Sequence, residues 1–135
     1  MIMPKVPLSS KGFHPFAEMI GFYFTKLGKK SSQCVLEVNE MLYNPHKVLH
    51  GGVLYSMADT GMGGALYPLL EKDELCATIE VKISYFKPVR SGTVTCDTEV
   101  INKGKTTATM ESEIKNNDII VAKASGTYSI FKTKE

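Results

Sequence analysis

One carboxylate stands out in this chain of 135 residues because its surroundings in the sequence are apolar or small. Asp59 is the one charged side chain between Val48 and Leu70, and it lies eight residues after the first glycine of His50-Gly51-Gly52. A carboxylate is costly to desolvate, so one in such a setting needs either a hydrogen-bonding partner or a chemical task. Asp59 is therefore either a buried structural carboxylate or a catalytic group, and we interpret it as the catalytic centre.

The residues before Asp59 are suited to polarising a carbonyl group. If the apolar stretch is a helix, Gly51 and Gly52 stand at its start, where backbone N–H groups lack acceptors and the helix dipole is positive. Glycine also leaves room for a ligand to approach the backbone. A carbonyl oxygen placed against such an N–H would be stabilised as it gains charge, an effect worth ~10² to 10³ in rate. Asn44 can add an amide donor or orient a water.

His50 has two interpretations, a hydrogen bond that fixes the turn before the helix, which we favour, and acid–base catalysis. As a metal site, His46 and His50 have a spacing that brings two ligands together on a helix. Pro45 and the glycine pair indicate a loop instead, and no cluster of Cys, Asp or Glu completes a zinc set. We expect no metal.

The stretch from Val48 to Leu70 is long enough to span a bilayer, but it contains five glycines, His50, Asp59 and Pro68. A helix that is apolar nearly all round is better explained as one that other elements of a globular protein surround. We therefore expect a buried central helix.

Strand patterns follow from about residue 76 to the end. Alternation is clearest in two segments, whose predicted inward residues are Val94, Cys96, Thr98 and Val100, then Ala108, Met110, Ser112 and Ile114. Residues 78–86 and 119–131 are rich in Ile, Val, Tyr and Thr, and residues 88–92, 103–105 and 116–118 have turn composition. These patterns predict an antiparallel meander of four strands.

Two more elements are expected upstream. Residues 34–42 are typical of a further strand, and the apolar spacing of residues 14–27 predicts a helix that ends at Gly28. The expected fold is α+β, with about five strands curled around one central helix.

Length and composition favour one domain, with residues 1–11 as a tail and residues 12–135 as the folded unit. The net charge of +2, with both signs interspersed, favours neither a nucleic acid nor a membrane as partner. Three widely spaced cysteines suit a reducing cytoplasm.

The run from Asn44 to Gly52, followed by Asp59 and then by Thr78-Ile-Glu-Val-Lys-Ile-Ser-Tyr85-Phe-Lys-Pro88, resembles the hotdog-fold acyl-CoA thioesterases. The likeness is to the phenylacetate-pathway type and to the thioesterase-superfamily member 2 enzymes, and it covers about residues 12 to 131. It implies hydrolysis of an acyl-CoA to a carboxylic acid and coenzyme A, without metal or redox cofactor.

The resemblance also implies a site shared by two subunits. Asp59 lies roughly 12 Å along the helix from a carbonyl held at its N-terminus, and a partner subunit can close that gap. Asn44, His50 and Gly51 would come from one subunit, and Asp59 and Thr78 from the other. Asp59 would activate water or act as a nucleophile, and Thr78 would hold the water, although a threonine at a strand start is also ordinary β composition. A homodimer or a homotetramer is expected.

Coenzyme A carries phosphate charges that basic side chains at strand junctions could meet. The resemblance also implies that the hairpin of residues 102–107 and Tyr85 contact the coenzyme, because the matching hairpin and tyrosine do so in relatives. The candidate substrate-binding residues are Tyr85, Arg90, Asn102, Lys103, Gly104, Lys105 and Thr106.

Two other functions stay open, a non-catalytic acyl-CoA-binding hotdog protein and a hotdog hydratase or dehydratase. The spacing of Asn44, Gly51 and Asp59 favours hydrolysis, because it supplies both a carbonyl polariser and a base for water. The sequence leaves the acyl group undetermined, since the Met and Tyr side chains of the central helix suit both a pocket and a core.

Overall fold

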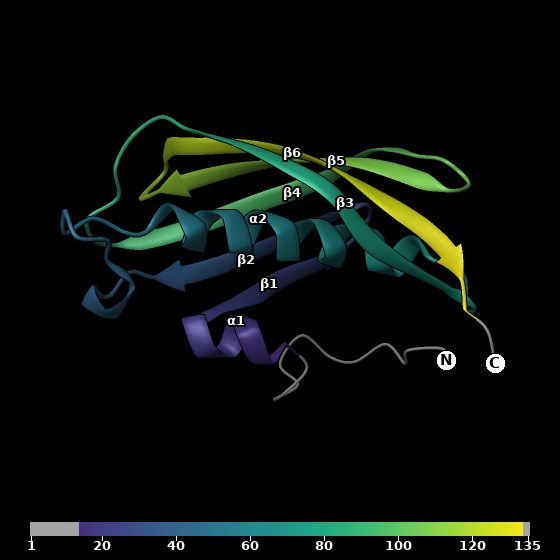
Figure 1. Ribbon diagram of the computed structural model, residues 1–135, viewed down its shortest axis with the longest axis horizontal. Helices are drawn as coiled ribbons and strands as arrows, with labels where there is room; N and C mark the ends of the chain where they lie inside the picture. The colour runs from purple at the N-terminus through teal and green to yellow at the C-terminus, as the bar shows by residue number, and fades with distance from the viewer. Residues whose placement is uncertain (1–13, 134–135) are drawn as a thin grey trace.

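The computed structural model describes residues 14–133, which form a curled sheet around one long helix (Figure 1). All strand pairs are antiparallel, and the strand order is β1-β2-β4-β5-β6-β3. In chain order the elements are α1 (Pro15–Ile20), β1 (Phe22–Gly28), β2 (Ser31–Glu37), η1 (Glu40–Leu42), α2 (Gly51–Leu66), η2 (Tyr67–Leu69), β3 (Glu74–Tyr85), β4 (Thr93–Lys103), β5 (Thr107–Asn116) and β6 (Ile119–Lys132). The predicted α+β class is confirmed.

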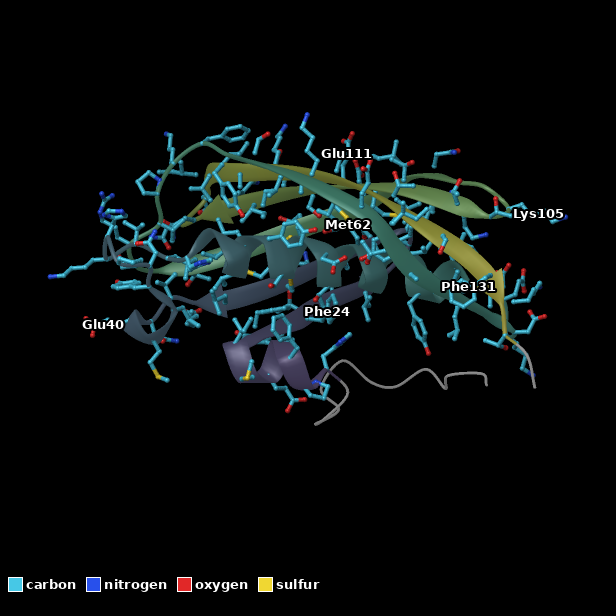
Figure 2. All side chains as sticks on the ribbon, viewed as in Figure 1. Phe24, Glu40, Met62, Lys105, Glu111 and Phe131 are labelled. Carbon is cyan, nitrogen blue, oxygen red and sulfur yellow. The ribbon has the colours of Figure 1, made fainter. Side chains whose placement is uncertain are left out.

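The apolar stretch forms the central helix, as predicted. On α2, Met57 and Met62 are fully buried, and Figure 2 shows Met62 between the helix and the sheet. Because other elements cover most of the helix, its nearly uniform apolar composition is the pattern expected of a core helix. Within residues 14–133, no helix is both long and apolar enough to cross a membrane.

The inward faces of β4 and β5 also agree with the sequence. Val94, Cys96 and Thr98 are buried on β4, while Asp97 and Glu99 on the same strand are more exposed. The four residues predicted to face inward on β5 are all buried. The alternation of apolar and polar residues therefore identified the core side of both strands, because each strand has one buried face and one solvent-exposed face.

The predicted helix over residues 14–27 is wrong beyond Ile20. Gly21 adopts φ +108° and closes α1, after which the chain becomes the edge strand β1. Phe22 and Phe24 suit a strand, and pairing with β2 satisfies the backbone of this segment. The sheet accordingly has six strands rather than about five. Gly28 ends β1 instead of a helix.

Two further expectations needed correction. The strand predicted over residues 34–42 ends at Glu37, and η1 follows, with the Asn39 side chain accepting a hydrogen bond from the Met41 N–H. The last four strands are not a simple meander, because β3 pairs with β6 at the sheet edge instead of with β4. The loop between β3 and β4 therefore passes β6 and β5 before the chain enters β4. In this loop the Gly92 carbonyl oxygen accepts a hydrogen bond from the Val38 N–H.

Candidate active site

The Asp59 carboxylate on α2 receives hydrogen bonds from two strands. Thr78 Oγ1 on β3 donates to Asp59 Oδ1 over 2.8 Å, and the Tyr128 hydroxyl on β6 donates to the same oxygen over 2.5 Å. The Tyr128 hydroxyl also lies 2.5 Å from the backbone carbonyl oxygen of Asp59. Because both side chains bind Oδ1, the Oδ2 atom is the one left to accept a proton from a water molecule.

A β-bulge aims Thr78 at this carboxylate. The pairing of β3 with β6 shifts between Thr78 and Glu80, so Ile79 is the extra residue. Val81 packs against the core, and strict alternation would turn Ile79 to that side as well. The bulge reverses the alternation and places Thr78 opposite Tyr128, with both side chains toward α2.

Tyr128 is a site residue that sequence reasoning missed. Its side chain is 4% exposed, and burial, with the Asp59 carboxylate as a second cause, raises the pKa of its hydroxyl far above the usual value. The Tyr128 hydroxyl therefore stays protonated near neutral pH and can donate a hydrogen bond to Asp59. The one signal in the sequence was its place at an inward position of the last strand, which does not distinguish it from core.

The start of α2 forms a second group of candidate residues. His50 is the N-cap, and its Nδ1 accepts the Gly52 N–H over 2.8 Å. The Tyr85 hydroxyl donates to the Gly51 carbonyl oxygen over 2.6 Å, and a Cβ at Gly51 would come within 3.0 Å of the Tyr85 ring. The Gly51 N–H has no acceptor within the helix, so it is the donor that this end of α2 can offer a ligand.

Asn44 holds the loop that precedes α2. Its Oδ1 accepts the His46 N–H over 2.8 Å and the Val48 N–H over 3.4 Å, so its amide nitrogen is the group left for a ligand. Asn44 and His50 therefore belong to the same end of α2. Asp59 lies about 12 Å further along the helix axis.

A cavity of about 320 Å³ opens beside Asp59, between α2, β1 and β3. His14 and Cys76 are two of its titratable wall residues. Burial lowers the pKa of His14, against the opposing effect of Glu18, and burial raises the pKa of the Cys76 thiol. Both side chains are therefore uncharged at neutral pH, and Asp59 is the one acidic residue among those that line the cavity.

The candidate coenzyme-binding residues lie at opposite ends of the sheet. Arg90 precedes β4, whereas the hairpin of residues 102–106 begins at the last two residues of β4, with exposed lysines such as Lys105 at its tip (Figure 2). The eleven residues of β4 separate these positions by roughly 33 Å. Within one subunit they form no common patch. Tyr85 is nearer to Arg90, and it lines a hollow of about 320 Å³ with Lys87 at the start of α2.

Among residues 14–133, no three side chains of His, Cys, Asp or Glu are grouped so that they could hold a metal ion. The predicted tail, residues 1–11, lies outside the described residues.

Comparisons with known proteins agree with this arrangement. The Thioesterase superfamily model matches residues 46–123, more than half of the chain. A Listeria monocytogenes protein named 1,4-dihydroxy-2-naphthoyl-CoA hydrolase is 30% identical over 72% of this chain and 79% of its own length. A conserved Pseudomonas aeruginosa protein of known structure is 32% identical, with a TM-score of 0.83 over 87% of this chain and 94% of its own.

A mutant of the phenylacetic acid degradation protein PaaI from Thermus thermophilus has a TM-score of 0.79 and 25% identity, over 85% of this chain and 97% of its own. The predicted resemblance to phenylacetate-pathway hotdog proteins is therefore confirmed, and so is the prediction of a thioester hydrolase at the level of the family. The family match, the likeness of fold and the carboxylate on the central helix agree, and this chain belongs to the thioesterase superfamily.

Proposed function

We propose that this protein hydrolyses an acyl-CoA thioester to a carboxylic acid and free coenzyme A, with Asp59 as the base that activates water. One observation carries the proposal. The Asp59 carboxylate is fixed through Oδ1 by Thr78 and Tyr128, and it faces an apolar cavity in a chain of the thioesterase superfamily. Relatives named as CoA-thioester hydrolases support the same substrate class.

In this mechanism a water molecule bound at Asp59 Oδ2 attacks the thioester carbonyl carbon. Its proton passes to the carboxylate as the new C–O bond forms, and the negative charge on the carbonyl oxygen is met by the Gly51 N–H. The C–S bond then breaks, and the proton held by Asp59 passes to the departing coenzyme A sulfur. The products are a carboxylic acid and a thiol, and the reaction as proposed uses no metal or redox cofactor.

Gly51 and Asp59 lie about 12 Å apart along one helix, and this separation supports the proposal that the two groups come from different subunits. The supporting observation is β3, an edge strand of twelve residues that carries the exposed Ile79 in its middle. A long edge with an apolar side chain is suited to pairing with another strand. We propose a homodimer in which Asn44, His50 and Gly51 of one subunit face Asp59 and Thr78 of the other, with two dimers forming a tetramer.

Coenzyme A binding is proposed at Tyr85 and at the hairpin Asn102, Lys103, Gly104, Lys105 and Thr106. Arg90 lies roughly 33 Å from the hairpin of its own subunit, so both can contact one coenzyme only from different subunits. A cytoplasmic location is also proposed. Its support is Cys34 and Cys96, which face each other across β2 and β4 as free thiols, a state that suits a reducing compartment.

The test of this function is thiol release from a panel of acyl-CoAs by the native protein and by Asp59→Asn. Asp118→Asn is the matched control, because Asp118 is exposed in a turn at φ +71°, a conformation that asparagine also adopts. We expect turnover to fall by ~10² to 10⁴ in Asp59→Asn and to be unchanged in Asp118→Asn. Absence of turnover in the native protein would instead favour the non-catalytic acyl-CoA-binding function.

A single turnover in ¹⁸O-labelled water separates the two roles considered for Asp59. A base delivers the label directly to the carboxylic acid, whereas a nucleophile forms a mixed anhydride with the acyl group. Water that opens the anhydride at the Asp59 carbonyl leaves the label on the enzyme. We expect the label in the product and none in Asp59.

A further inference from the structure

The cavity beside Asp59 has one polar end, and the rest of its wall is mostly apolar. The polar end is the cluster of Asp59, Thr78 and Tyr128. Gly63 and Gly64 continue the wall about 6 to 7.5 Å further along α2. His14, Thr60 and Ala77 also line the cavity, and the larger apolar and aromatic side chains of its wall are Phe24, Leu27, Tyr67, Leu70, Leu75 and Cys76. An apolar group attached to a carbonyl at Asp59 would therefore find a matching surface.

The volume of this cavity limits what it can hold. An apolar protein cavity of about 150 Å³ binds benzene, which has six carbon atoms. The cavity of about 320 Å³ is roughly twice as large and is partly open, so at the same filling its walls enclose about twelve carbon atoms. The thioester carbonyl and the attacking water occupy part of the end near Asp59. An acyl group of about six to ten carbons would then fill the rest of the cavity.

Phe24 forms the part of the cavity wall that lies beside Gly64, about 7.5 Å along α2 from Asp59. A Cβ at Gly64 would come within 2.6 Å of two Phe24 ring atoms and 3.4 Å of Leu27, so the ring lies directly on the helix backbone. Figure 2 shows Phe24 on the side of β1 that faces α2. Its ring also contacts the His14 ring, with centroids 5.8 Å apart. Removing the Phe24 ring would lengthen the cavity.

We propose that this cavity is the acyl-binding site, that it selects compact apolar acyl groups of about six to ten carbons, and that Phe24 is the residue that limits their length. The inference rests on the proposed function, because it assigns the acyl group of that reaction. Straight-chain and aromatic acyl groups can both be compact and apolar. The assay distinguishes them by using octanoyl-CoA for the first kind and phenylacetyl-CoA for the second.

The catalytic test compares kcat/KM for acetyl-, octanoyl-, phenylacetyl- and palmitoyl-CoA. The native protein should prefer octanoyl- or phenylacetyl-CoA over both extremes by at least about tenfold, because one well-placed methylene is worth roughly 10-fold or more in discrimination. Phe24→Ala should raise the ratio of palmitoyl to octanoyl turnover by about tenfold or more. Phe24→Leu, which retains an apolar side chain, should show a smaller change in the same direction if Phe24→Ala does not fold.

Tyr23→Ala is the matched control, since Tyr23 precedes Phe24 on β1, points to the other face and is 52% exposed. It should leave the preference for acyl length unchanged. A native preference for palmitoyl-CoA, or a Phe24→Leu variant with native preference, would overturn the proposal.

Binding of S-alkyl coenzyme A thioethers, measured by calorimetry, separates this inference from the proposed function. These probes carry two, eight or sixteen alkyl carbons and cannot be hydrolysed. Tightest binding of the eight-carbon probe without any thioesterase activity would refute the function and retain the acyl site. Turnover together with equal binding of all three probes would retain the function and refute the acyl site.

Discussion

Loss of the Tyr128 hydroxyl is expected to weaken both the fold and the reaction. Tyr128→Phe keeps the buried ring and removes only the donor that contacts Asp59 Oδ1 at 2.5 Å. A hydrogen bond to a charged acceptor is worth about 1.5 to 3 kcal/mol. Asp59 is only half-buried, so water replaces part of the lost bond. We therefore expect the free energy of unfolding to fall by about 1.5 kcal/mol, the lower end of that range.

The same substitution should lower kcat by about tenfold and leave KM nearly unchanged, because the Tyr128 hydroxyl is bound to Asp59 and the ring that lines the cavity is retained. Urea unfolding and thiol release measure the two effects, and Tyr23→Phe controls for loss of an exposed hydroxyl. Thr78 donates to the same oxygen, so Thr78→Val and Tyr128→Phe should couple by about 0.5 to 3 kcal/mol in a double-mutant cycle. Native kcat in Tyr128→Phe, together with additive stability losses, would refute this account of the site.

Two further predictions concern the helix cap and the pH dependence. His50→Ala removes the acceptor of the Gly52 N–H and should destabilise the protein by about 1 kcal/mol, whereas His50→Asn retains a cap and should have near-native stability and turnover. If both variants lost ~10² in kcat at native stability, the imidazole would act in acid–base catalysis. For Tyr128, burial raises the pKa above the unfolded value of about 10, so the folded state keeps a proton that the unfolded state releases. Its contribution to stability is complete below about pH 10 and declines as the pH rises further. At about pH 11, unfolding of the native protein should therefore produce one more phenolate than unfolding of Tyr128→Phe produces. Ultraviolet absorbance measures the number of phenolates, and an equal number in the two proteins would contradict the prediction.

The elements whose pattern depends on burial alone could be predicted from the sequence. The apolar stretch identified α2, since a helix covered on nearly all sides needs no polar face. Alternation identified the inward residues of β4 and β5, because each strand has one dry and one wet face. The chemistry of Asp59 after a glycine pair also pointed to the family that the comparisons show.

Local pattern was misleading where a segment takes its structure from a distant partner. The spacing of Phe16, Ile20 and Phe24 suited a helix, yet hydrogen bonds with β2 and a left-handed turn at Gly21 make the second half a strand. The pairing of β3 with β6 could not be predicted from the sequence either, because strands that follow one another in the sequence usually pair.

The candidate site divides in the same way. Residue types and spacing were enough to select Asp59, Gly51 and His50, because capping and carboxylate chemistry are local properties. Only the tertiary structure brought Tyr128 to Asp59, across 69 positions of the chain, and only the bulge at Ile79 turned Thr78 toward the same oxygen. A register shift in one strand pair decides which side chains face inward, and that register depends on two strands at once, so neither strand carries it alone.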